Sequence, residues 1–372
     1  MKIHFQVTAD GWREADLKIK GDKEEMKLKK SITVLAAAGV LTAMTVTGCG
    51  SKLNSDETVA TVGDEKITLG VANFYARFQQ GQYETYYASM MGTTGEDMWT
   101  QEVSDGKTFE SQTKKTLLEN LENMYLLSQH ASDYDVELTD DEKASIKDAA
   151  ETFVSDNTDE AKDAVSGTEE NVEKVLELMT IQTKMSTAMK EGVDENVSDD
   201  EAAQKAMQYV IFSYTTTDDS GNSTTITDDE KADLKKKAQD VLDKVKAGGD
   251  FEKLAEDAGV TVLTATFDSE STSPDEDLIA AADKLEKAGD VTDLVETDNG
   301  IYIGKLTSLL DRDATDSKKT SIVEERKQDQ YDSLLKEWKD DTTIDVNKGV
   351  WKKVNFEKQG VTIKTSSSDS AE

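Results

Sequence analysis

The stretch VKAGGDFEKLA, residues 245–255, marks the point at which one helix ends and a shorter one begins. Upstream, apolar residues recur at helical spacing, and the predicted helix 228–247 packs through Leu234, Ala238, Val241, Leu242 and Val245. The pair Gly248-Gly249 ends this helix, because glycine readily adopts the backbone conformation that closes a helix. A short second helix then begins at Phe251 and stops at Gly259.

Strand patterns lie on both sides of these two helices. Residues 208–214, 260–266 and 300–306 are rich in β-branched and aromatic side chains, and residues 278–285 have helical spacing. The order strand, helix, helix, strand, helix, strand predicts a compact α+β unit over 204–312. A polar loop, 215–222, follows the first of these strands.

The remainder of the chain reads as mainly helical. Two short strands are expected around the Gly-Asp turn in 59–68, and helices are expected from Leu69, over 109–131, around 172–189 and over 321–339, with a strand-like stretch at 350–354. Three capping boxes announce helix starts, at Thr139–Glu142, Ser198–Glu201 and Thr227–Glu230. The predicted fold class is therefore α+β, a mainly helical lobe with a small inserted domain whose antiparallel sheet is flanked by helices.

Cys49, the only cysteine, ends the tetrad VTGC at 46–49. Three lysines at 27, 29 and 30 and an apolar stretch at 32–41 precede it, in the order of a secretory signal. The apolar stretch is shorter than the ~20 residues that a spanning helix needs, which favours a cleaved signal over a transmembrane anchor. The tetrad resembles the bacterial lipobox. This resemblance implies that Cys49 receives a diacylglyceryl group (a palmitate-type lipid), becomes the mature N-terminus and holds the protein on the extracytoplasmic face of the cell membrane.

The terminal segments fit the same interpretation. Met26 is a natural start for the signal peptide 26–48, so we interpret residues 1–25 as a mis-called, untranslated start; the alternative is a real cytoplasmic extension that contains His4 and Trp12. Small and polar residues predict a flexible tether at 49–57. The end of the chain, 357–372, is predicted to be a disordered tail.

The composition of the chain limits the kinds of molecule that the protein can bind. The formal net charge of −34 argues against nucleic acid and against broad contact with anionic lipid head groups. The negative charge favours basic or unfolded cationic clients. The alternative is that the acidic faces are simply solvated and bind no client. A single cysteine leaves no partner for a disulfide bond. The sequence has no phosphate loop and no His-Glu-x-x-His, and the polar loop at 218–222 lacks the spacing of a calcium loop, so we expect no cofactor and no metal.

The order of these segments resembles the extracellular foldase lipoproteins of the PrsA type and, more distantly, the periplasmic chaperone SurA and helical lobes of the trigger-factor kind. Residues 59–68 match the opening segment of that family, and the stretch from Leu117 through Glu142 matches its long helix and the segment that follows it. Residues 245–255, 285–293 and 299–306 match three segments of its parvulin domain. The resemblance implies a SurA-like chaperone lobe at 58–203, a parvulin-like domain at 204–312 and a returning segment, 313–356, that completes the lobe.

The resemblance also locates a candidate active site. Active parvulins carry one histidine on the first strand and another on the last, and these positions are Tyr209 and Tyr302 here. We expect these tyrosines to be the catalytic positions and Phe212, Phe267 and Leu278 to contact substrate. The glycine-rich segment of the family is replaced by residues 264–268. His130, at a helix end of the other lobe, is interpreted as a surface residue.

Three functions follow for comparison. The first is a membrane-tethered chaperone for unfolded or newly exported polypeptides, with peptidyl-prolyl isomerase activity weak or lost because the histidines are missing. The second is an active parvulin-type isomerase that works through tyrosine hydroxyls. The third, a solute-binding lipoprotein, requires two lobes of alternating strands and helices, a pattern that the chain lacks outside 208–306. A homodimer is left open.

Overall fold

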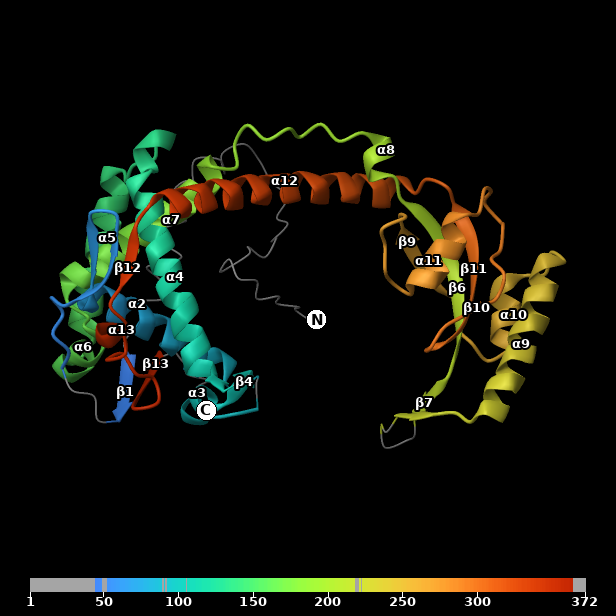
Figure 1. The fold of residues 1–372 in the computed structure, drawn as a ribbon, viewed down its shortest axis with the longest axis horizontal. Coiled ribbons are helices and arrows are strands. Elements are labelled where there is room, and N and C mark those ends of the chain that lie inside the picture. The colour runs from blue at the N-terminus through green and yellow to red at the C-terminus, as the bar shows by residue number, and fades with distance from the viewer. Residues whose placement is uncertain are drawn as a thin grey trace, which may run out of the picture. The chain divides into compact units, whose positions relative to one another are not determined.

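The computed structural model describes residues 44–363 apart from 49–51, 89, 91, 105, 218–220 and 222. The chain forms two compact units (Figure 1). The first contains the described residues up to Glu191 together with those from Tyr331 onward, and the second is Gly192–Gln330. Every strand pairing among the described residues is antiparallel, and long helices accompany small sheets. The predicted α+β fold class is confirmed.

A three-stranded sheet joins the two ends of the first unit. Strands β2 (Thr58–Val62) and β3 (Glu65–Thr68) form the expected hairpin, whose turn places Gly63 at φ +57°, a conformation that glycine adopts without strain. Strand β12 (Ile344–Val346) pairs with the other edge of β2. The chain therefore returns to its first strands after the second unit.

Helices bury the apolar side chains of the first unit. Helix α2 is enclosed on most sides, and Phe74 on it meets Phe153 of α5 edge-to-face at 5.2 Å. The expected long helix is α4, and the helix expected around 172–189 is α7. The helices and short strands of this unit are α2 (Leu69–Gln82), η1 (Tyr83–Tyr87), α3 (Gly95–Thr100), β4 (Glu102–Ser104), β5 (Lys107–Thr108), α4 (Phe109–Gln129), η2 (Ala131–Tyr134), α5 (Asp140–Asp156), α6 (Asp159–Val165) and α7 (Glu169–Ala188).

The second unit is built around one four-stranded sheet in the order β10-β11-β6-β9. Helices α9 and α10 lie on one side of β6 and β11, and α11 lies on the other (Figure 1). The expected polar loop is instead a short hairpin, β7 and β8. The elements are α8 (Asp199–Ala202), β6 (Lys205–Ser213), β7 (Thr215–Thr217), β8 (Ser223–Thr225), α9 (Asp228–Lys246), α10 (Phe251–Asp257), β9 (Leu263–Phe267), α11 (Glu276–Asp283), β10 (Val295–Glu296) and β11 (Gly300–Ser308).

Two of the three capping boxes form completely. At Thr139 and Thr227 the hydroxyl accepts from the backbone of the glutamate three residues later, whose carboxylate accepts from the cap N–H in return. Ser198 makes only the first of these bonds, and the carboxylate of Glu201 pairs with Arg326 of α12 (Arg312–Asp341). The prediction of a box at Ser198 is therefore wrong, because a guanidinium competes for the carboxylate.

The C-terminal segment differs from its prediction in two places. The strand-like stretch at 350–354 is helix α13 (Lys348–Trp351) and a turn, because the side chain of Asn347 caps the helix by accepting from the N–H of Val350. Residues Gln359–Ile363 form strand β13, so the predicted disorder of 357–372 is wrong for them. Every second side chain of this strand is buried, namely Gln359, Val361 and Ile363, and their burial stabilises the strand against the rest of the first unit.

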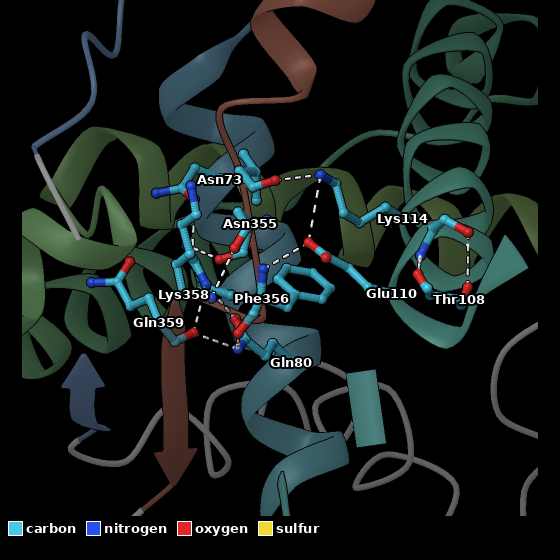
Figure 2. A network of polar contacts seen from close by, with 12 residues as sticks. Asn73, Gln80, Thr108, Glu110, Lys114, Asn355, Phe356, Lys358 and Gln359 are labelled. Atoms are coloured by element: carbon cyan, nitrogen blue, oxygen red, sulfur yellow. Dashed lines mark hydrogen bonds and ion pairs between the residues drawn. The ribbon is translucent and has the colours of Figure 1, made fainter. Parts of the chain in front are cut away.

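Side chains of α2 and α4 fasten the segment that leads into β13 (Figure 2). Buried Arg77 donates to the carbonyl oxygens of Asn355 and Gln359, and Gln80 donates to Gln359 as well. The carboxylate of Glu110 accepts from the N–H of Phe356 at 2.7 Å. Several backbone groups of this segment thus find partners on side chains of the helices, as buried polar groups require.

The residues around the predicted cleavage site fall into three groups. Met44–Gly48, the end of the predicted signal peptide, form strand β1, which pairs with β13. Cys49 and residues 1–43 lie outside the described part of the chain. The predicted flexible tether is wrong for 52–57, since Ser55 and Glu57 accept from the first N–H groups of α2 and Lys353 pairs with Glu57.

Candidate functional site

Tyr209 and Tyr302, the candidate catalytic residues, lie on the α11 side of the second unit's sheet. Strands β6 and β11 pair so that Tyr302 is opposite Ile211 and Gly304 is opposite Tyr209. The two tyrosines are therefore diagonal neighbours on one face, and their ring centroids lie 6.3 Å apart. The structure brings together the two positions that the sequence singled out.

The two rings differ in exposure. Tyr302 is buried, with 5% of its surface exposed, and Tyr209 is half-buried. Burial, with smaller contributions from Asp275 and Tyr209, raises the pKa of Tyr302, so its hydroxyl is neutral and protonated at pH 7. Neither hydroxyl has a hydrogen-bond partner among the described residues. Each could donate one hydrogen bond to a carbonyl oxygen that reached it.

The predicted substrate-contacting residues divide between the two faces of the sheet. Phe267 and Leu278 belong to the same apolar cluster as Tyr302, and both have no exposed surface. Phe212 points to the opposite face, into the cluster under α9 and α10. The structure therefore brings Phe267 and Leu278 to the tyrosines and does not bring Phe212 there.

Gly304 is a contributor that the sequence reasoning missed. A Cβ atom at this position would lie 3.1 Å from Leu278 and 3.3 Å from Thr292, closer than ordinary contact. The bare backbone lets α11 approach the sheet beside Tyr209. A glycine inside an otherwise β-branched strand indicates such a close approach, and this signal could have identified it.

Asp268, which follows β9, is held as an anion by its neighbours. Although partial burial opposes the change, hydrogen bonds from Gln204 and Ser271 and the ammonium group of Lys318 lower the pKa of Asp268 to about 2. Its carboxylate is thus committed to joining β6, β9 and α12 within the second unit. It has no proton to give near pH 7.

His130 belongs to the first unit, whereas the tyrosines belong to the second. It caps the C-terminus of α4 in the first unit, where Nδ1 lies 3.0 Å from Asp133 and the ring stacks on Trp338 at 4.1 Å. The sequence shows no other histidine except His4, so residues 192–330 contain none. The second unit therefore has no imidazole to use.

The second unit also has a surface hollow away from the tyrosines. A shallow pocket of about 400 Å³ lies between α9 and α10, on the side of the sheet opposite the tyrosines, and is lined by Lys244, Ala247, Gly249, Asp250, Lys253, Leu254 and Asp257. Within the described ranges, no group of three or more His, Cys, Asp or Glu residues is arranged to hold a metal ion. Among the same residues, no helix combines the length and the apolar character that crossing a membrane requires.

Two family models match the chain. Residues 24–162 match a SurA-like N-terminal domain, and residues 223–316 match a PPIC-type peptidyl-prolyl isomerase domain. The second range includes Tyr302 and begins after Tyr209. No curated protein matches the chain.

Solved structures that match the chain include three from bacteria. The foldase PrsA of Streptococcus pneumoniae has 19% identity and a TM-score of 0.30, and the match covers 69% of this chain and 98% of that chain. A structure of the SurA-like chaperones PEB4 and Cj1289 of Campylobacter jejuni has 10% identity and a TM-score of 0.26, with 78% and 98% covered. PrsA of Bacillus subtilis has 16% identity and a TM-score of 0.22, with 85% and 97% covered. The chain thus contains a SurA-like N-terminal domain followed by a PPIC-type isomerase domain, the combination that its resemblance to the parvulin-type foldases implied.

Proposed function

We propose that this protein is a membrane-anchored, extracytoplasmic foldase that acts as a chaperone for exported polypeptides and whose peptidyl-prolyl isomerase activity is weak or lost. The observation that carries the proposal is the replacement of both family histidine positions by Tyr209 and Tyr302 on a sheet face that is already filled. Phe267, Leu278 and Tyr302 pack against one another there with almost no exposed surface.

The filled face bears directly on isomerisation. Rotation about an X-Pro bond must cross a barrier of about 18–20 kcal/mol, and a catalyst accelerates it only by binding the twisted amide better than the planar one. A twisted amide needs an apolar recess and a donor aimed into it. Tyr302 offers a neutral hydroxyl, but its ring packs with Phe267 and with Leu278 of α11 and is 5% exposed, so it presents little apolar surface to a substrate. Weak catalysis or none follows.

Chaperone activity is supported by the first unit. Its N-terminal part matches a SurA-like domain, and exposed apolar side chains follow α2 along the chain: Tyr86 is 44% exposed, Met90 75% and Val103 49%. Exposed apolar surface of this kind can bind the apolar segments of an unfolded chain. The π-helical turn η1, which contains Tyr86, interrupts the regular helix at this point, and such turns are frequent at functional sites.

Membrane anchoring is supported by the sequence alone. The lysines, the apolar stretch and the VTGC tetrad occur in the order of a lipoprotein signal, and the compartment would be the extracytoplasmic face of the membrane. A Cys49→Ser variant should then appear in the soluble extracellular fraction, whereas the unaltered protein should sediment with membranes and yield a lipid-modified N-terminal peptide in mass spectrometry. Equal sedimentation of both proteins would contradict the anchor.

One pair of assays separates the chaperone from an isomerase. The whole protein is added to a proline tetrapeptide, to measure cis-to-trans relaxation, and to an aggregating unfolded protein, to measure light scattering. We expect suppressed scattering and a relaxation rate within about twofold of the uncatalysed rate. Strong acceleration that Tyr209→Phe or Tyr302→Phe abolishes would establish the alternative, an isomerase that uses tyrosine hydroxyls.

A further inference from the structure

Strand β13 has two edges, and the backbone N–H and C=O groups of each edge find hydrogen-bond partners of a different kind. On one edge side chains of α2 and η1 replace a neighbouring strand: Glu84 accepts from the N–H of Val361 at 2.8 Å, and Thr85 accepts from the N–H of Ile363 at 2.9 Å. Gln359 on the same edge accepts from Arg77 and Gln80. Because residues alternate along a strand, Gly360 and Thr362 turn their backbone groups to the other edge.

That other edge is occupied by strand β1. The register pairs Thr45 with Thr362 and Thr47 with Gly360, so these are the pairs that exchange backbone hydrogen bonds. Val46 and Met44 alternate with them, and their N–H groups point away from β13. The N–H of Met44 donates to Oδ1 of Asn157 at 2.6 Å, in agreement with this assignment.

The seat of β1 is shaped for a strand with apolar residues at alternate positions. Met44 is 4% exposed and Val46 is half-buried, while Thr45 and Thr47 face outward. A Cβ atom at Gly360 would lie 2.6 Å from Oγ1 of Thr47, so a larger residue there would force the Thr47 hydroxyl to move. Asn157 is 7% exposed, and its amide is held by the carbonyl of Phe153, which fixes its oxygen toward the seat.

The occupant of this seat belongs to the predicted signal peptide. If the chain is cut before Cys49, as in the proposed function, all of Met44–Gly48 leaves with the signal. Gly360 and Thr362 then lose their backbone partners, and the oxygen of Asn157, which is 7% exposed with β1 in place, loses its donor. An unpaired strand edge presents free N–H and C=O groups that pair readily with another strand.

We propose that the free edge of β13 is a strand-addition site for an extended segment of a client polypeptide, and that Met44–Gly48 fills it until the signal peptide is removed. This inference rests on the proposed function. An unfolded chain offers the features of β1: free backbone groups and two apolar residues separated by one small residue. The two positions that donate to β13, equivalent to Thr45 and Thr47, exclude proline because it lacks an N–H.

The test uses an N-acetylated, C-terminally amidated peptide of sequence MTVTG, with a fluorophore, as a stand-in for a client strand. It is titrated against the chain from Cys49 onward and against the full chain. A full chain with Thr45→Pro and Thr47→Pro, which removes both donors of β1, provides an opened seat that does not depend on truncation. Circular dichroism verifies that each protein is folded.

We expect the peptide to bind the chain from Cys49 and the double variant but not the unaltered full chain. Methylating the peptide's backbone nitrogens at the positions of Thr45 and Thr47 should weaken binding at least about tenfold, since two hydrogen bonds are lost. Methylation at the position of Val46 should change it less than about twofold. Carboxymethylated, permanently unfolded α-lactalbumin should compete.

Three results would overturn the site. The first is that the peptide binds neither the folded chain from Cys49 nor the folded double proline variant. The second is that the two methylation patterns weaken binding equally. The third is that the chain from Cys49 self-associates and the peptide dissociates this complex, which would make a second copy the occupant. Mass spectrometry of the native N-terminus separates this inference from the proposed function. An uncleaved N-terminus refutes the anchor while the peptide data stand, and a cleaved N-terminus without peptide binding refutes only the site.

Discussion

Replacing Arg77 with alanine should unfold the first unit at much lower denaturant concentration. The guanidinium, 3% exposed, donates to the side-chain oxygens of Asn73 and Gln80 and to the carbonyl oxygen of Asn355, at 3.3, 2.6 and 3.1 Å. Each of these acceptors would lose a donor. Gln359 would keep its bond from Gln80, so three orphaned acceptors remain. Burial lowers the pKa of Arg77 to about 10, so the guanidinium remains charged at pH 7.

The magnitude follows from those three acceptors. A buried polar group left without a partner costs about 1–3 kcal/mol, and water entering the vacated volume recovers part of that cost. Removing one member of a buried charged network typically costs about 3–5 kcal/mol, and we expect a loss in this range. With a urea slope of about 2 kcal/mol/M, the unfolding midpoint should fall by roughly 2 M.

Tryptophan fluorescence isolates this effect. Trp99, Trp338 and Trp351 lie in the first unit, and the sequence 192–330 contains no tryptophan. Trp99 packs on Phe356 at 4.8 Å, beside the network. Lys115→Ala serves as the control, because this lysine is 68% exposed and its ion pair with Glu119 contributes little to stability. The free energy of unfolding of this variant should change by less than about 0.5 kcal/mol.

Arg77→Lys should give an intermediate loss, since lysine keeps the charge without the planar fork that reaches several oxygens at once. A loss below about 1 kcal/mol in Arg77→Ala would refute the reasoning. It would mean that the C-terminal segment is held by apolar packing and that the network around Arg77 contributes no net stability.

Two further predictions concern the second unit, followed by hydrogen exchange because it lacks tryptophan. The pKa of Asp268 is lowered to about 2, so the stability that its carboxylate contributes is present above about pH 4 and is lost as the pH falls toward 2. Asp268→Asn should therefore lower the free energy of unfolding by about 2 kcal/mol at pH 6 and leave it unchanged near pH 2. A difference that stays constant between these pH values would exclude the linkage. Gly300→Ala should strip protection from β6, since φ is +156° and the new Cβ would overlap the carbonyl oxygen of Phe212. Gly289→Ala, with φ +97° and open space, should cost only about 1 kcal/mol, and equal losses at both glycines would count against the clash.

Much of the fold could be predicted from local patterns. The helix that ends at Gly248-Gly249, the hairpin around Gly63 and the complete capping boxes at Thr139 and Thr227 depend on residues a few positions apart. Their hydrogen bonds close within the segment, so the sequence contains the whole cause. The failures share the opposite property. Glu201 pairs with Arg326 and does not complete its capping box, and the backbone of strand 359–363 finds its partners on α2, η1 and β1, which are distant in the chain.

The candidate site shows the same division. Register along β6 and β11 places Tyr209 and Tyr302 on one face, as their positions in the resembling family implied. Phe212 was predicted to lie beside Tyr209, but successive side chains of a strand alternate between its two faces. Residues three positions apart therefore lie on opposite faces, and Phe212 packs under α9 and α10. Whether the face was open could not be predicted, because the packing of Leu278 against Gly304 depends on how closely α11 approaches the sheet.

The two-part organisation was predicted from the sequence by itself, and the lipoprotein-like start and the tyrosines at the family's histidine positions are likewise predictions that rest on the identity and spacing of residues. Only the tertiary structure decided that the tyrosine face is filled, that a buried arginine fastens the C-terminal segment and that β1 lies on the edge of β13. These features join residues far apart in the chain, for example Met44 with Ile363 and Arg77 with Gln359. Such contacts depend on how whole elements pack, and no short-range pattern records that.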